Sequence, residues 1–223
     1  MHILIIGGNG RTGKLVISAA LQQGHTITAL VRDPDALEKT HGLTIVKGTP
    51  LSKTDITTAI TQSPNPVGSI IVTLKARRAT DNPFSPSIAP PRLMADCHKN
   101  LIEAMKEFSI GKIVTMSAFG VGDSSPNMNW VLRLLIRRLS NMAAEFHDHD
   151  LVDEEVRTSG VDFTLVRPVM MTEGSGLEVK EWGQTGDGVG MFAKVTRGSV
   201  AEFLLESAVG TKARVREAVV ISN

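Results

Sequence analysis

Apolar and polar residues alternate along this chain in a way that predicts repeated strand–helix units. Six short apolar runs bounded by turn residues are expected strands, at residues 2–6, 26–31, 43–48, 68–74, 111–117 and 161–168. Between the strands, apolar residues recur at helical spacing, most clearly in residues 11–24 and 91–108. Strands that are apolar throughout indicate a sheet covered on both faces. The pattern therefore predicts an α/β fold with a mainly parallel sheet.

Two long segments interrupt this alternation, and each directly follows an expected strand. Residues 75–91 contain four prolines, and residues 169–192 are rich in glycine. Loops beyond the carboxyl ends of strands form the ligand crevice of an open α/β sheet. We expect pocket elements from residues 75–91, 118–150 and 169–195, although surface insertions without a ligand are the alternative.

Composition narrows the class of protein. The 24 basic and 23 acidic side chains are nearly balanced, which argues against a nucleic-acid partner. No apolar run approaches the roughly 20 residues of a membrane span, and the single cysteine, Cys97, fits a reducing compartment as a buried side chain. We expect a cytoplasmic protein without a membrane partner. The basic segment Arg133–Arg138 is expected to be the solvated face of an amphipathic helix rather than an anion or partner site.

The segment GGNGRTG, residues 7–13, lies between the first expected strand and the first expected helix. Glycine permits a tight turn and lets the backbone approach a pyrophosphate, while the helix N-terminus offers unpaired N–H groups to the phosphates. The alternative is a strand–helix turn without a ligand. The cofactor contacts expected in this loop are Gly7, Asn9, Gly10, Arg11, Thr12 and Gly13.

The G-x-x-G-x-x-G spacing resembles the extended and atypical short-chain dehydrogenases/reductases. The segment GGNGRTGKLV is especially similar to the branch that contains biliverdin reductase B (flavin reductase) and the NmrA-like proteins. The segments ALVRDP, IVTMSAFG and EEVRTSGVDFTLVRP agree with it, so the resemblance covers essentially the whole chain. It implies one NAD(P)-binding Rossmann domain, residues 1–223, with a doubly wound sheet and a small C-terminal substrate-binding portion. A monomer or a homodimer is expected.

The end of the second strand favours NADP(H) over NAD(H). Arg32 suits the 2′-phosphate, whereas the neighbouring Asp33 is expected either to cap a helix or to bind a ribose. Thr49 stands where the family commonly has an acid facing the adenine. The resemblance adds Thr73, Leu74, Arg77, Ser117, Pro168 and Val169 as cofactor contacts, with a plain surface charge as the alternative for Arg77.

The chain contains no tyrosine, so the Tyr-x-x-x-Lys proton relay of typical short-chain dehydrogenases is absent. Phe146 and Asp150 occupy a similar frame. The family resemblance implies that Ser117, at the end of the fifth strand, is a catalytic or substrate-binding hydroxyl, and a bond to the backbone is the alternative. His147 or His149 is a candidate proton donor, against a solvated helix face. Their spacing does not suit a shared metal, so no metal site is expected.

These features favour an NADPH-dependent reductase of a flat, aromatic or conjugated small molecule, such as a flavin, a quinone or a polyketide-like intermediate. In the resembling branch, hydride transfer needs little beyond positioning, and solvent can supply the proton. A non-catalytic NmrA-like dinucleotide sensor is one alternative. The other is an isomerase or dehydratase that uses His147, His149 or Asp150 as a base.

Overall fold

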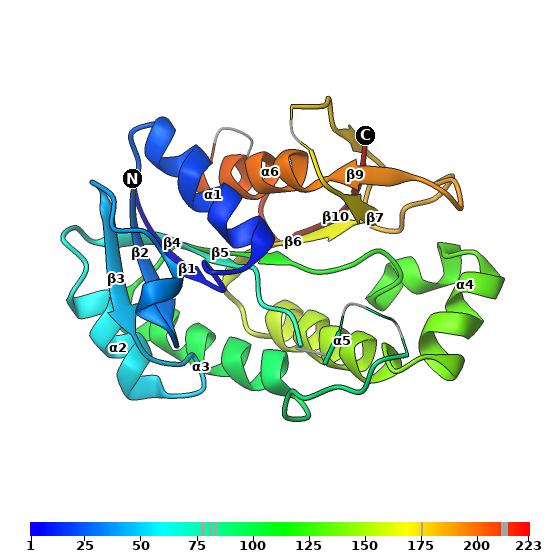
Figure 1. Cartoon of the computed structure of the whole chain (residues 1–223), viewed down its shortest axis with the longest axis horizontal. Helices are drawn as coiled ribbons and strands as arrows, with labels where there is room; N and C mark the ends of the chain where they lie inside the picture. The colour runs from blue at the N-terminus through cyan, green and yellow to red at the C-terminus, as the bar shows by residue number, and fades with distance from the viewer. Residues whose placement is uncertain (77–78, 81, 83, 175, 211–213) are drawn as a thin grey trace.

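An eight-stranded sheet forms the centre of the computed structural model, which describes residues 1–76, 79–80, 82, 84–174, 176–210 and 214–223 (Figure 1). The strand order is β3-β2-β1-β4-β5-β6-β10-β8, and every pair is parallel except β10 with β8. The strands are β1 (His2–Ile6), β2 (Thr26–Val31), β3 (Leu43–Lys47), β4 (Val67–Val72), β5 (Lys112–Met116), β6 (Asp162–Pro168), β8 (Lys180–Glu181) and β10 (Glu217–Ser222). A separate parallel pair joins β7 (Met170–Thr172) to β9 (Lys194–Thr196).

Helices cover both faces of this sheet. Figure 1 shows α1 (Arg11–Gln22) and α6 (Arg197–Val209) on one face, and α2 (Lys53–Thr61), α3 (Leu93–Phe108) and α5 (Ala143–Thr158) on the other. Successive side chains of a strand point to opposite faces. In β1 the odd residues Ile3 and Ile5 join the core under α1 and α6, and the even residues Leu4 and Ile6 join the core on the other face.

The prediction of a Rossmann-type, mainly parallel α/β fold is confirmed. All six expected strands are present, with ends within two residues of the predicted bounds. The sequence pattern did not single out α6 or β10. Small and apolar residues cover most sides of α6, so the helical period that marks a half-buried helix is weak there.

A smaller helical segment extends from the carboxyl edge of the sheet. It contains the 3₁₀ helix η2 (Gly122–Asn127), then α4 (Trp130–Leu134) and the π-helical η3 (Leu135–Leu139). The 3₁₀ helix η1 (Pro34–Ala36) lies elsewhere, after β2. The expected helix around Arg133–Arg138 is therefore present. Its apolar side chains are not all turned inward, because this ten-residue helical stretch packs mainly on α5.

None of the described helices combines the length and the apolar character that crossing a bilayer requires.

Candidate cofactor and active site

The glycine loop between β1 and α1 is closed so tightly that two of its glycines have no room for a side chain. Gly7 has a φ of +85°, and a Cβ there would lie 2.9 Å from the carbonyl of Thr73. A Cβ on Gly13 would lie 2.3 Å from the carbonyl oxygen of Gly7. These contacts bring the start of α1 close to the carboxyl ends of β1 and β4.

Gly10 forms the N-cap of α1 and leaves the helix end open. Its N–H donates to the Gly7 carbonyl at 3.0 Å, and no side chain caps the helix. The first N–H groups of a helix lack helical partners, so this end suits an anion. Asn9, Gly10 and Arg11 are exposed here, whereas Thr12 is buried.

Arg11 also contacts a segment far along the chain. Its Nη1 lies 3.3 Å from Oε1 of Glu173, which follows β7. The same carboxylate oxygen accepts a hydrogen bond from Nε of Arg197 at 2.9 Å. Glu173 therefore lies next to the loop expected to bind the pyrophosphate.

Thr73 fastens the glycine loop to the end of β4. Its hydroxyl donates to the carbonyls of Gly7 (3.1 Å) and Ile6 (3.3 Å), and its N–H donates to Ile6. Thr73, which was expected to contact the cofactor, thus holds the glycine loop in place. Leu74 lines the adjoining cavity. The expected contact at Arg77 lies outside the described residues.

A cavity of about 190 Å³ lies beyond the carboxyl ends of β2, β3 and β4. Arg32 and Lys75 bring two cations to it. Asp33 acts as a helix cap: its side chain accepts a hydrogen bond from the N–H of Asp35 at 3.2 Å at the start of η1. The remaining lining residues are Thr49, Pro50, Leu51, Leu74, Ile88, Ala89, Pro90, Leu93 and Cys97.

This lining is mostly apolar, which suits the flat face of an adenine. Thr49 contributes a backbone N–H that donates to Oδ2 of Asp55 at 2.9 Å, so an acid of α2 lies beside it. Cys97 is buried as expected, and burial raises the pKa of its thiol to about 12. The sequence reasoning missed Lys75 and the apolar contribution of Ile88 and Leu93. The signal for them was the proline-rich segment that follows a strand end.

Ser117 is buried immediately after β5. Its N–H donates to the carbonyl of Val166 at 2.7 Å, and its hydroxyl has no hydrogen bond to another described residue. The predicted backbone contacts at β6 are engaged within the fold. The Pro168 carbonyl accepts from Phe119 at 3.0 Å, and the Val169 N–H donates to Ile221 at 3.2 Å.

The two candidate histidines of α5 lie in different surroundings. His147 is exposed, and His149 is buried. Burial, with a smaller effect of the neighbouring His98, lowers the pKa of His149 to about 4. Its ring is therefore uncharged at neutral pH, and its Nδ1 has no hydrogen-bond partner among the described residues. This placement favours hydrogen bonding by a neutral imidazole over proton donation by a charged acid.

Asp148 and Asp150 of α5 are bonded within the fold. Both oxygens of Asp148 accept N–H groups at the start of α3, from Met94 at 2.8 Å and from Ala95 at 3.0 Å. Burial alone would raise the pKa of Asp150, but hydrogen bonds from Arg137 and the Gly122 N–H outweigh it, and the pKa is lowered. A paired carboxylate of low pKa is a weak general base. Among the described residues, no cluster of three or more His, Cys, Asp or Glu side chains is arranged for a metal ion.

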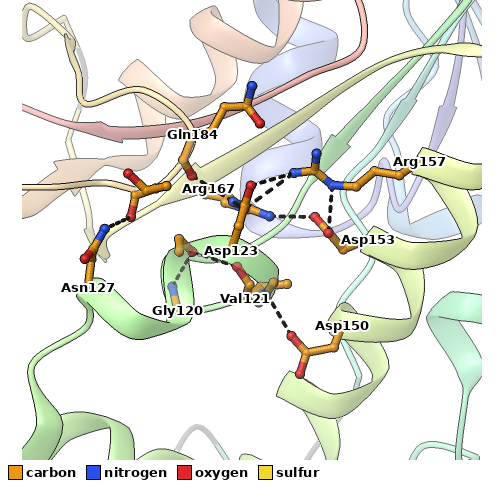
Figure 2. Close-up of polar contacts among 12 residues, drawn as sticks. Gly120, Val121, Asp123, Asn127, Asp150, Asp153, Arg157, Arg167 and Gln184 are labelled. Atoms are coloured by element: carbon orange, nitrogen blue, oxygen red, sulfur yellow. Dashed lines mark hydrogen bonds and ion pairs between the residues drawn. The ribbon is translucent and has the colours of Figure 1, made fainter.

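Arg167 of β6 organises the other side of the site (Figure 2). Its buried guanidinium donates to Oδ1 of Asp153 at 2.6 Å, to the carbonyl of Gln184 at 2.8 Å, and to Asp123. Arg157 joins both carboxylates from the solvent side. One guanidinium thus fixes η2, α5 and the loop after β8 around the end of β6. An arginine inside an apolar strand was the sequence signal for it.

Comparison with known proteins agrees with this geometry. Residues 7–209 match the model of a family described as NAD(P)H-binding. The chain belongs to this NAD(P)H-binding family. Its resemblance to atypical short-chain dehydrogenases/reductases is confirmed.

Among curated proteins, this chain is similar to the photosystem II assembly factor Ycf39 of Synechocystis, with 29% identity over 119 residues. That match covers 52% of this chain, and it spans only 33% of the relative's length.

Solved structures show the same fold over the whole chain. ChuY, described as an anaerobillin reductase from Escherichia coli O157:H7, has a TM-score of 0.78 at 18% identity, with 100% of this chain and 97% of that chain covered. A short-chain dehydrogenase/reductase from Veillonella parvula in complex with NADP has a TM-score of 0.73 at 13% identity, with 100% and 94% covered.

Proposed function

We propose that this protein is an NADPH-dependent reductase of a flat, conjugated small molecule. The observation that carries the choice of cofactor is the cavity at the end of β2. Arg32 and Lys75 both line this cavity, and Asp33 is used as a helix cap. Two cations suit a 2′-phosphate, and none of the described residues that line this cavity is a carboxylate that could accept a ribose hydroxyl. The solved relative with NADP supports the same choice.

Calorimetry with NADPH and NADH tests this choice. We expect wild type to bind NADPH more tightly, because a charge-assisted hydrogen bond contributes about 1.5–3 kcal/mol, or roughly tenfold to over a hundredfold in affinity. Arg32→Ala should remove most of that preference. Arg138→Ala, an exposed arginine of η3 far along the chain, is the matched control. Equal wild-type affinities for the two cofactors would contradict the assignment.

When bound, NADPH supplies a hydride, and the chain's own task is to position the acceptor. Ser117 is placed for this, because it is buried at the end of β5 and its hydroxyl is not used by the described protein. A neutral hydroxyl orients a carbonyl through one hydrogen bond but is a weak acid. With no tyrosine in the chain and a low pKa at His149, the proton comes from solvent in this proposal.

A screen for NADPH consumption tests the reaction and the substrate class. Flavins, quinones and linear tetrapyrroles are the acceptors to compare, the last because ChuY is described as an anaerobillin reductase. We expect steady oxidation of NADPH with at least one of them, reduced in Ser117→Ala. Tight NADPH binding without turnover on any acceptor would instead support the dinucleotide sensor, for which the missing tyrosine is the argument.

A further inference from the structure

The outer side of α4 and η3 exposes a concentrated set of apolar side chains. Five of the 15 large hydrophobic side chains exposed among the described residues lie within this ten-residue stretch. Trp130 is 68% exposed and Leu139 63% exposed. Figure 1 shows α4 at one end of the molecule, away from α1, α2 and α3. The α4–η3 face is defined by Trp130, Val131, Leu134, Leu135 and Leu139, together with Arg133 and Arg138.

The charge of this face has a single sign. Between residues 124 and 144 the sequence contains three arginines and no acidic residue. Arg137 is turned inward and paired with Asp150. Arg133 and Arg138 are exposed, and in the described part of the chain neither forms an ion pair. The face therefore combines apolar side chains with two uncompensated positive charges.

The face is held in place from behind. Leu132 and Ile136 pack on a small core that contains Val121, Met128 and Phe146. The Arg137 guanidinium lies 5.5 Å from the centre of the Phe146 ring and also bonds the Gly120 carbonyl. The inner side of the helix is thus fully used by the fold, and the exposed apolar residues belong to a side that the described chain does not cover.

We propose that the α4–η3 face docks on the surface of an anionic lipid membrane. A helix with tryptophan and leucine on one side and arginine beside them is suited to the boundary between headgroups and acyl chains. Arginine side chains reach anionic headgroups while their stems lie on apolar surface. The sequence predicted no membrane partner because no apolar run is long enough to span a bilayer, and a helix that lies on the membrane surface needs no such run.

A second copy of the chain fits this face less well. A two-fold interface brings the same patch of both copies together, so Arg133 and Arg138 would face their own counterparts without an acid between residues 124 and 144 to pair with. Anionic lipid supplies the missing negative charge as well as an apolar layer. An acidic protein partner would supply the charge also, and the experiment separates the two.

Flotation with vesicles tests the proposal. Wild type should float with phosphatidylcholine vesicles that contain phosphatidylglycerol and should bind pure phosphatidylcholine much more weakly. In a Trp182→Phe background Trp130 is the remaining tryptophan, and its emission should shift to the blue on binding. Arg133→Gln/Arg138→Gln should weaken binding to the anionic vesicles about 10- to 30-fold, since each arginine near such a surface contributes about fivefold.

The contribution of the apolar side chains is tested with Leu134→Gln/Leu139→Gln. This variant should no longer float with the anionic vesicles, and its NADPH affinity should be unchanged. Phe192→Gln is the matched control, because Phe192 is 75% exposed but lies outside the face. Equal loss in Phe192→Gln, equal binding to both vesicle types, or no flotation at all would overturn the proposal. The proposal would also be overturned if ultracentrifugation without lipid showed a wild-type dimer that is lost only in Leu134→Gln/Leu139→Gln. Cofactor affinity is measured separately, so a failure here is distinct from a failure of the reductase assignment.

Discussion

Gly10 and Gly13 belong to one motif, but glycine is required at the two positions for different reasons. A Cβ on Gly13 would lie 2.3 Å from the Gly7 carbonyl oxygen, whereas a Cβ on Gly10 meets only that same atom, at 3.2 Å. Gly13 is thus required by the packing of α1 on the loop. A Cβ on Gly10 could be accommodated by a small movement of the loop. Gly10 is therefore needed for the open space that it leaves in front of the N-terminus of α1.

Substitutions at the two positions should therefore fail in different ways. Gly13→Ala should lower the free energy of unfolding by about 1–3 kcal/mol through overpacking. Gly10→Val should stay folded but lose NADPH binding, because its side chain occupies the approach to the pyrophosphate. Urea unfolding and calorimetry measure the two effects. Native NADPH affinity in Gly10→Val would mean that the loop has only a structural role.

The contacts that each side chain makes were the part of the site hardest to predict from the sequence. The loop of residues 7–13 and Arg32 were found by spacing, because their position relative to a strand end is local. Thr73 was expected next to the cofactor, yet its hydroxyl bonds Gly7, a residue 66 positions away. Lys75 was missed for the same reason, since only the folded chain brings it to Arg32.

At the scale of elements, α5 carries a matched pair of histidines that should report on acid sensitivity. His149 has a pKa of about 4 in the fold, against about 6.5 when unfolded, and buried His98 is lowered to about 4 as well. Between these values the unfolded chain binds more protons, so stability is full above pH 6.5 and falls as the pH drops toward 4. His149→Gln should reduce that loss in thermal melts at stepped pH, and the part due to His98 should remain. His147→Gln, exposed on the same helix, should leave it as in wild type.

The Arg167 network should behave as a unit that joins η2, α5 and the loop after β8. Removing one partner of a buried ion pair costs about 3–5 kcal/mol, because the other charge stays buried. Arg167→Leu should reach the lower end of that range, since Asp153 has a side chain only 10% exposed but keeps its bond to Arg157. Arg157→Leu touches the same two carboxylates from a more exposed position and should cost less. Equal losses in urea unfolding would contradict a special role for Arg167.

The sequence predicted a helix or strand correctly where one face of the element is buried, or where a short strand is buried on both faces. The six strands fit that condition, and α3 shows a clear helical period. The α4–η3 segment was expected to keep its apolar residues inside. Too few other elements pack against this segment to cover its apolar side chains. The spacing of apolar residues along a sequence does not show how many elements will pack against a helix.

At the scale of the whole molecule, the cofactor should tie distant parts of the chain together. The glycine loop, Arg32, residues 88–93 and Ser117 come from four stretches of sequence around one edge of the sheet. NADPH at 100 times its dissociation constant should add about 2.7 kcal/mol to stability. For a chain of this size that corresponds to roughly 5–10 °C in Tm. Differential scanning calorimetry measures the shift, which Gly10→Val should lose.

The bond between Arg11 and Glu173 has a consequence for how fast the cofactor exchanges. Glu173 already lies beside Arg11, the cation that we expect to bind the pyrophosphate, so the arriving anion competes with a carboxylate supplied by the protein. Both side chains are largely exposed, which limits the pair to about 1 kcal/mol or less. Glu173→Gln should therefore speed NADPH association several-fold in stopped-flow measurements, most visibly at low salt, where steering of an anion is strongest. The free protein would then hold its cofactor less tightly than a variant without this carboxylate, because Glu173 pairs with Arg11 again each time the dinucleotide leaves.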